Sequence, residues 1–516
     1  GQVTVVLFVA LILLIGAISY FRLFDTYELT LLDLRFKSRP LQKINPQIAI
    51  VEIGDDTLVN LKSWPLPRDY HATLIKVLSV CRVRAVIFDV LFSEPQASDE
   101  LLEEATKQAA NVYYPYALNL QEQKANLWQS SEFAARLLPD LAASARGTGH
   151  ANVFADRDGK RRRIPLFINY QGQPLPQLSL KAAADYLGIG TEEIRIFPGK
   201  SVQLGEDIRI PIDQEAAALV NLAGTWKDTF AHFSFYDILA AYAESNQGEN
   251  LPPILTQLQD KICFVGLTAT GTADLNATAL EPVYPMVGLH ANFFNSVLNN
   301  SFLRRVSPLI NLLILYLLCL VSVFLTIRMR PFEGLLYQLG LLSVFAGAGF
   351  LVFQTFGLWL DLFFPLVACM LVYVGTNLVR YIKELHTREL LEKELSIARN
   401  IQRSFLQDVP QDLEGVDLAV EMDTAKHVGG DLYDFVKFPD GRIGLMVGDV
   451  SGKGVPAALF MAQTISRFRY FANICTSPGE TLSKLNQDIS RDSKSGLFVT
   501  MVYLIYDPAS HKVNLA

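Results

Sequence analysis

The chain has 516 residues, of which 50% are hydrophobic and only 19% are charged. One hydrophobic core rarely serves so long a chain, so several domains are expected, and the hydrophobic fraction indicates dense apolar runs among ordinary globular stretches. The net charge of −7 argues against a nucleic-acid partner, because no excess of basic side chains is present to neutralise phosphates.

The five cysteines are scattered, without a CxxC pair and without a His/Cys spacing typical of zinc sites. Cys81 and Cys263 share one large globular region. A disulfide between them and two isolated buried thiols are both compatible with the sequence.

Four segments are long and apolar enough to cross a bilayer as helices, which takes about 20 residues. They are residues 3–21, 308–327, 334–356 and 358–379. No small-residue cleavage site follows the first segment, so it is interpreted as a retained anchor rather than a signal peptide. Asp361, near the start of the fourth, is expected at the membrane interface rather than as a functional charge inside the membrane.

The orientation follows from the short loops, since Lys and Arg accumulate on the cytoplasmic side of membrane proteins. Basic residues follow the second and fourth segments, namely Arg328, Arg330, Arg380, Lys383 and Arg388. Residues 22–307 are therefore predicted outside the cell membrane, and everything after residue 379 inside.

The outside region alternates between short apolar runs and helical periodicity. Residues 48–53, 85–92 and 262–267 are continuous apolar runs rich in β-branched residues, and helices are expected at residues 70–80 and 101–110. Continuous apolarity is typical of strands covered on both faces, which predicts a mainly parallel α/β sheet.

Several polar residues interrupt these apolar blocks and are candidates for a ligand site, because the strand ends of a parallel sheet are where small molecules bind. The candidates are Asp55, Asp56, Arg68, His71, Asp89, Asp274, His290 and Asn292. The alternative is that they cap helices or pair with one another inside a large domain.

The order of blocks in this region resembles the second class of CHASE sensor domains, periplasmic modules of bacterial receptors. The blocks that carry the resemblance include LLDLRFKSRP (31–40), IAIVEIGDDTL (48–58), AVIFDVLFSEP (85–95) and VGLHANFFNSVLNNSFLRR (287–305). In this family one membrane helix typically precedes the sensor and three follow it. The resemblance implies a sensor for an unknown periplasmic ligand.

Residues 380–407 form a charged run without proline or glycine, which predicts a helical linker. A 4-3-4-3 spacing links Leu391, Leu395, Ala398, Gln402 and Phe405. This spacing indicates the start of a coiled-coil seam and hence a homodimer. A single solvated helix is the alternative.

Two carboxylates stand beside glycines in the last 120 residues. Asp431 follows two glycines in VGGDLYDF (428–435), and Asp449 ends an apolar strand before a glycine-rich turn in GDVSGKGVPAALFMA (448–462). Carboxylates that converge from neighbouring strand ends can hold Mg²⁺ or Mn²⁺, and two such ions can activate water toward a phosphoryl group. For either aspartate alone, a helix cap or turn is the alternative.

With ELSIARNIQRSFL (394–406) and FVTMVYLIYDP (498–508), these motifs resemble the SpoIIE-like branch of the PPM metal-dependent serine/threonine phosphatases. The resemblance implies that Asp431 and Asp449 bind two Mn²⁺ or Mg²⁺ ions, with the backbone carbonyl of Val450 as a further ligand. It also implies a sandwich of antiparallel sheets flanked by helices from residue 408 onward. The family's remaining metal-binding aspartates lie in later motifs, so we expect no measurable phosphatase activity from residues 1–516 alone.

The sequence thus predicts a multidomain protein of the bacterial inner membrane: an α/β periplasmic sensor, four transmembrane helices, a helical linker and part of an α+β phosphatase domain. By resemblance, the substrate is a phosphorylated regulatory protein such as an anti-sigma-factor antagonist. A ligand receptor or scaffold with a non-catalytic output domain, and a receptor with a cyclase or kinase output, are the alternatives. A transporter is disfavoured, because one peripheral carboxylate offers no polar pathway.

Overall fold

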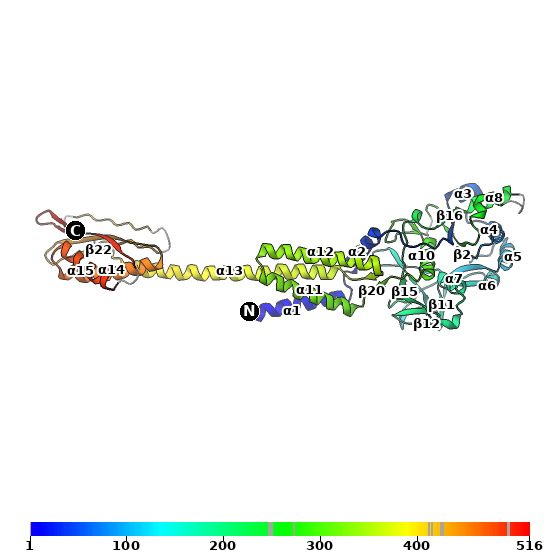
Figure 1. The fold of residues 1–516 in the computed structure, drawn as a ribbon, viewed down its shortest axis with the longest axis horizontal. Coiled ribbons are helices and arrows are strands. Elements are labelled where there is room, and N and C mark those ends of the chain that lie inside the picture. Colours follow the sequence, from blue (N-terminus) through cyan, green and yellow to red (C-terminus); the bar gives the residue numbers. More distant parts are fainter. Residues whose placement is uncertain are drawn as a thin grey trace. The chain divides into compact units, whose positions relative to one another are not determined.

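The computed structural model describes residues 2–245, 251–271, 274–410, 413, 416–423, 428–492 and 496–516. The chain divides into two compact units, Gly1–Asn377 and Leu378–Ala516. Each unit is described by itself (Figure 1).

A seven-stranded sheet forms the centre of the globular part of the first unit. Its strands are β16 (Ala231–Ser234), β1 (Ile48–Ile53), β17 (Ile262–Leu267), β2 (Ala85–Asp89), β3 (Val112–Leu118), β7 (Gly147–His150) and β6 (Phe133–Ala135). All neighbouring pairs are parallel except β3 with β6. The predicted mainly parallel α/β sheet is therefore confirmed, although the run at residues 85–92 leaves the sheet after Asp89.

Both faces of this sheet are buried, which explains why its strands read as unbroken apolar runs. Along β1, Ile48 and Ile50 enter one core, whereas Ala49 and Val51 enter the other. The first core is covered by α7 (Leu178–Tyr186) and α10 (Met286–Leu298), and the second by α4 (Arg68–Val80) and α5 (Asp99–Ala109). The helices α4 and α5 confirm those expected at residues 70–80 and 101–110.

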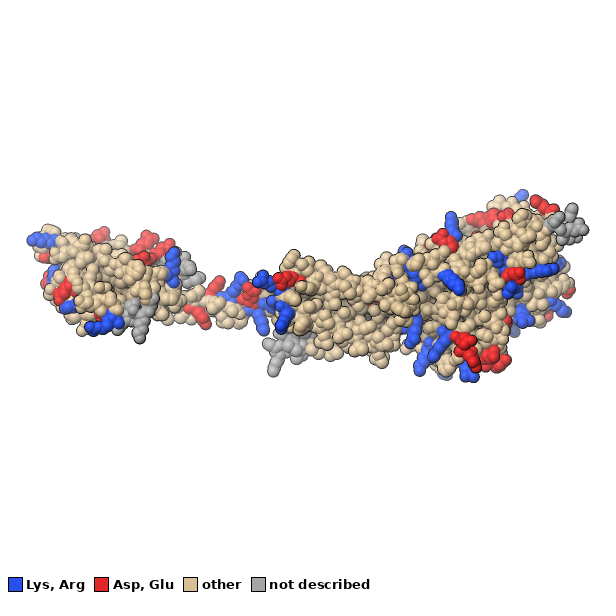
Figure 2. Space-filling model, in the orientation of Figure 1, with Lys and Arg blue, Asp and Glu red and all other residues tan. Residues whose placement is uncertain are grey.

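Three helices of the described chain are long and apolar enough to cross a membrane, namely α11 (Pro308–Arg328), α12 (Pro331–Phe356) and α13 (Phe363–Phe405). A fourth span is counted if the bent pair made of α1 (Gln2–Tyr20) and α2 (Asp25–Ser38) is one span. The visible surface of α11 and α12 carries almost no charge (Figure 2). The sequence predicts four membrane helices, so three of them are found and the first depends on whether the bent pair is one span.

The fourth apolar segment begins later than predicted. Leu358 and Trp359 form a short strand, β21, that pairs in parallel with β20 (Arg304–Arg305), and the helix starts only at Phe363. Asp361 lies in the connection between them, buried and ion-paired with Arg305 at 3.0 Å. The boundary was misplaced because an apolar dipeptide in a strand has the same hydropathy as one in a helix.

The second unit contains a four-stranded antiparallel sheet. Its order is β22 (Leu432–Lys437), β23 (Ile443–Val450), β24 (Val499–Asp507) and β25 (Lys512–Leu515). Helices α14 (Val455–Ile474) and α15 (Pro478–Asp492) share one apolar core with this sheet. Of the predicted sandwich, the described residues show one sheet and its helices, and a second sheet stays a prediction.

The linker predicted at residues 380–407 is helical, because α13 continues without interruption to Phe405. Leu391 is 54% exposed in the single chain. The exposure leaves both the coiled-coil homodimer and the single solvated helix as open interpretations.

Candidate functional site

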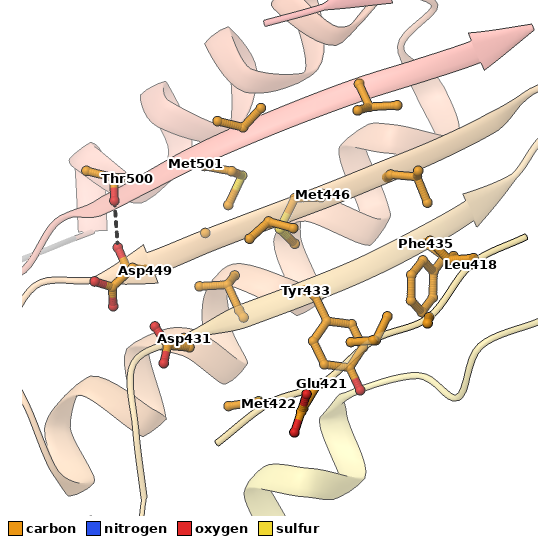
Figure 3. A pocket seen from close by; sticks show the side chains of 18 of the residues that line it. Leu418, Glu421, Met422, Asp431, Tyr433, Phe435, Met446, Asp449, Thr500 and Met501 are labelled. Atoms are coloured by element: carbon orange, nitrogen blue, oxygen red, sulfur yellow. Dashed lines mark hydrogen bonds between the residues drawn. The ribbon is translucent and has the colours of Figure 1, made fainter. Parts of the chain in front are cut away.

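Asp431 and Asp449 lie side by side at the ends of two paired strands. Leu432, the first residue of β22, pairs with Gly448 of β23, so the residue before Leu432 and the residue after Gly448 are neighbours across the ladder. Figure 3 shows the two carboxyl groups close together at this edge of the sheet. The sequence expectation that these two side chains meet agrees with this geometry.

Glycine at position 430 is required by close backbone packing. A Cβ atom there would lie 2.7 Å from the carbonyl oxygen of Val450, far inside van der Waals contact. The N–H of Val450 also donates a hydrogen bond to the carbonyl of Gly430 at 3.3 Å. The carbonyl of Val450 is therefore held directly against the backbone that carries Asp431.

The two carboxyl groups open into a cavity of about 780 Å³. The cavity lies between the extended segment at residues 418–423 and the strands β22, β23 and β24 (Figure 3). Partial burial raises the pKa of Asp431, and the charge of Asp449 and a hydrogen bond with it raise this pKa further. Two carboxylates held this close repel each other, and a cation between them would relieve the repulsion and stabilise their charged forms.

The donor set at this edge fits a hard divalent cation in part. Two carboxylates and one backbone carbonyl are the oxygen ligands that Mg²⁺ and Mn²⁺ accept. Within the described residues, no group of three or more His, Cys, Asp or Glu side chains is arranged to hold a metal. The described residues therefore offer only part of the ligand set that such an ion would need.

Sequence reasoning missed one contact beside Asp431. Gln402, at the end of α13, was assigned to the coiled-coil seam, but its side chain is buried against the loop before Asp431. Its Nε2 donates to the carbonyl of Gly429 at 2.6 Å, and its Oε1 accepts from the N–H of Gly429 at 3.3 Å. A polar residue at a seam position was the only available signal.

A buried ion pair joins the same sheet to its covering helix. Arg469 of α14 donates to both carboxylate oxygens of Asp434 in β22, at 2.7 and 3.1 Å. Its Nη2 also donates to the carbonyl of Phe405, the last residue of α13, at 2.7 Å. Arg469 thus ties α14, β22 and the end of α13 together.

In the sensor domain, three of the eight ligand candidates come together at the carboxyl end of the parallel sheet. Nε2 of His290 lies 3.6 Å from Oδ1 of Asp89, and Asp274 is close enough to both to influence their charges. His150, which sequence reasoning missed, is fully buried beside His290, and neither of its ring nitrogens has a hydrogen-bond partner among the described residues. Gln177 lies 2.8 Å from Nδ1 of His290.

Burial dominates the ionisation of this cluster, because it disfavours the charged form of every member. It raises the pKa of Asp89 to about 7 and that of Asp274 to about 6, with the charge of Asp89 adding to the latter. It lowers the pKa of His290 to about 4 and that of His150 to about 3. At neutral pH the two imidazoles are therefore uncharged.

The other five candidates have structural partners. Asp55 and Asp56 accept hydrogen bonds from side chains of a neighbouring loop and strand. Arg68 donates to the first carboxylate of α5 at 2.9 Å, and Asn292 bonds a buried tyrosine hydroxyl and two backbone groups. His71 is surrounded by three phenylalanine rings. Asp55, Asp56, Arg68 and Asn292 therefore match the alternative of internal pairing, whereas Nδ1 of the buried His71 has no hydrogen-bond partner among the described residues.

Cys81 and Cys263 are both buried and both free, so the disulfide is not formed. Cys81 lies at the C-terminal end of α4 and Cys263 lies in β17, and both thiols are buried in the second core of the sheet. Two free buried thiols in one core are the outcome.

A parallel α/β domain, a set of apolar helices and a separate antiparallel unit with paired carboxylates define a multidomain membrane sensor protein. Residues 4–326 match the CHASE2 domain family, and residues 439–516 match the family of stage II sporulation protein E (SpoIIE). The chain belongs to the CHASE2 domain family and carries a SpoIIE domain at its C-terminal end. Both resemblances seen in the sequence are confirmed.

Each curated relative matches a quarter of the chain or less. The chain is 32% identical to phosphoserine phosphatase RsbU of Bacillus subtilis over 127 residues, which is 24% of this chain and 37% of that protein. It is 35% identical to protein IcfG of Synechocystis over 104 residues, 20% of this chain and 16% of that protein. Phosphoserine phosphatase RsbP of Bacillus subtilis is 24% identical over 127 residues, 24% of this chain and 31% of that protein.

Among solved structures, the crystal structure of the RsbU and RsbW domains of Rv1364c from Mycobacterium tuberculosis is 32% identical. The match covers 17% of this chain and 23% of that one, with a TM-score of 0.15, which is too low to support a statement about the fold. The chain spans well under half the length of each curated relative it matches.

Proposed function

We propose that this protein is a transmembrane receptor of the bacterial inner membrane whose cytoplasmic output removes phosphate from serine or threonine of a regulatory protein. The observation that carries this proposal is the meeting of Asp431 and Asp449 at adjacent strand ends, within a cavity of the SpoIIE region. Two of the similar proteins are named phosphoserine phosphatases, which supports phosphoserine as the substrate class.

In this proposal the carboxylates of Asp431 and Asp449 and the carbonyl of Val450 hold Mn²⁺ or Mg²⁺, two ions in all. Such ions lower the pKa of bound water and polarise phosphoryl oxygens. Asp431 and Asp449 fix the site at the sheet edge, and the Gly430 contact keeps the carbonyl of Val450 beside them. The extended segment at residues 418–423 forms the opposite wall of the cavity.

The proposed domain limits follow the sequence expectation, corrected at the fourth helix. They are a membrane helix at residues 3–21, a periplasmic sensor at 22–307, membrane helices at 308–327, 334–356 and 363–379, a helical linker at 380–407 and the phosphatase domain from 408. The positive charges after the second and fourth helices support the sensor outside and the output inside. The proposed partners are a periplasmic ligand, a second copy of the chain and an anti-sigma-factor antagonist as phosphorylated substrate.

The experiment is a phosphatase assay on the natural receptor in lipid nanodiscs, with a phosphoserine peptide and added Mn²⁺. Asp449→Asn should abolish Mn²⁺-dependent turnover while thermal unfolding stays unchanged. The matched control is Asp440→Asn, which removes an exposed carboxylate from the turn between β22 and β23 and should leave turnover intact. Unchanged turnover in Asp449→Asn contradicts the proposal, and the absence of Mn²⁺ binding by calorimetry favours a non-catalytic output.

A further inference from the structure

The helix α2, which follows the first membrane helix, carries a fully buried carboxylate. Each oxygen of Glu28 accepts two hydrogen bonds: Oε1 from Arg35 at 2.6 Å and from the indole N–H of Trp359 at 2.9 Å, Oε2 from the backbone N–H groups of Leu362 and Phe363 at 2.8 and 2.9 Å. The last two groups are the first donors of α13. Glu28 therefore caps the N-terminus of the helix that continues to the output domain.

The turn before α13 is held on its other side as well. Arg35 of α2 donates to the carbonyl of Leu360 at 2.8 Å, so both members of the buried Glu28–Arg35 pair grip the same turn. Arg305, from the end of the sensor, lies 4.1 Å over the Trp359 ring and binds Asp361. Arg305 also binds Asp25 in the first turn of α2 at 2.9 Å.

The same helix is joined to the sensor by a second buried carboxylate. Asp33 accepts two hydrogen bonds from Arg162, at 2.7 and 2.9 Å, and one from Lys160 at 2.5 Å. The side chain of Arg162 is 1% exposed, and it also binds Asp156 and Asp158 of its own turn. This turn belongs to the sensor.

The two carboxylates lie five residues apart on one helix, a rise of about 7.5 Å. Leu29, Leu32 and Phe36, between and beside them, are buried in the first sheet core, so α2 is packed as one rigid element. Energetic coupling between distant sites can be carried by packed side chains, by hydrogen-bond and ion-pair networks and by rigid helices. Here Asp33 provides the contact with the sensor, and Glu28 provides the contact with α13.

We infer that α2 is the element that transmits conformational change from the sensor to α13, with Asp33 as its input contact and Glu28 as the positioning residue for the start of α13. A movement of the turn that holds Arg162 displaces α2 through Asp33. Glu28 then shifts or releases the first turn of α13. The inference rests on the proposed receptor function, but all the contacts that carry it lie within the first unit.

The experiment measures helix position rather than enzyme activity, so its failure is distinguishable from failure of the proposed phosphatase. Nitroxide labels are placed by Leu317→Cys on α11 and Leu371→Cys on α13, both exposed positions, and all five native cysteines are buried. Electron–electron distance measurements are made on the whole chain in nanodiscs, diluted with unlabelled protein.

Asp33→Asn keeps the shape of the side chain but removes its charge, and should shift the mean distance between the labels by about 1–2 Å, the usual size of helix displacements in switching proteins. The matched control is Asp158→Asn, which removes a carboxylate from the same Arg162 without touching α2, and should leave the distance unchanged. In a Glu28→Gln background, Asp33→Asn should no longer shift the distance. The carboxamide keeps only one acceptor oxygen, so it cannot bind Arg35 and Trp359 on one side and the backbone N–H groups at the start of α13 on the other, and the link between α2 and α13 is weakened.

An unchanged distance in Asp33→Asn overturns the inference, and so does an equal shift with and without Glu28→Gln. If Glu28→Gln fails to fold, Trp359→Phe serves instead, because it removes one donor to Glu28 and keeps an aromatic ring beneath Arg305. With that variant, the shift caused by Asp33→Asn should be reduced, and an undiminished shift overturns the inference as well.

Discussion

Removing Arg469 should destabilise the second unit far more than neutralising its partner. The Asp434 side chain is 0% exposed, whereas that of Arg469 is 32% exposed. Arg469→Ala leaves a buried carboxylate without a counter-charge, a change that costs about 3–5 kcal/mol. Asp434→Asn leaves a guanidinium that water reaches and an amide oxygen that still accepts a hydrogen bond, so the loss should be about 1–2 kcal/mol.

The assay is hydrogen exchange of the β22 amides in the intact chain, because it follows one strand of the second unit, whereas thermal unfolding follows the whole chain. Exchange reports the free energy of opening of this strand by itself. The double variant should cost less than the sum of the single changes, with a coupling of about 1–3 kcal/mol. Equal losses for the two single variants, or additive losses in the double variant, refute the assignment of Asp434–Arg469 as a buried, mutually dependent pair.

Three further changes test other contacts. Gln402→Ala removes two hydrogen bonds to Gly429 and should lower the free energy of opening of that loop by about 1–3 kcal/mol, measured by hydrogen exchange. The same variant should weaken Mn²⁺ binding, measured by calorimetry. Gly430→Ala should cost about 1–3 kcal/mol through overpacking, whereas Gly479→Ala, at a position with open space, should be neutral in the same exchange experiment. Because burial raises the pKa of Asp89 to about 7, its protonated form stabilises the fold, and this contribution is lost as pH rises from about 4 through about 7. Asp89→Asn should therefore gain stability relative to the natural chain between about pH 5 and pH 8 in thermal unfolding, and a constant difference across that range contradicts the shift.

The sensor architecture could be predicted because its strands carry an unambiguous pattern. Runs such as residues 262–267 are apolar at every position, and the structure places successive side chains of β1 in two separate cores. Helix boundaries were less accurate where hydropathy alone decided them. The start of α13 was placed five residues early because pairing of Leu358 and Trp359 with the end of the sensor depends on residues more than fifty positions away.

The two aspartates of the candidate metal site could be predicted from the sequence. A helix cap or a turn explains one aspartate beside glycines, but it does not readily explain two of them at neighbouring strand ends. The contacts around the pair could not. Gln402 is polar at a position where periodicity predicts a seam, and nothing local indicates that Gly429 is its partner. His150 was missed for a similar reason: it is the last residue of a short glycine-rich strand, and only the fold brings it beside His290.

The two-residue pairing of β20 with β21 holds the starts of the helices α11 and α13 at a fixed position relative to each other. Arg305 and Trp359 are partners in this pairing. α11 begins three residues after Arg305, and α13 begins four residues after Trp359. One residue inserted between Arg305 and Pro308 would lengthen this extended connection by about 3.3 Å, and α11 would have to shift against α13 to absorb it. The length of these short connections therefore fixes which faces of the two helices can touch.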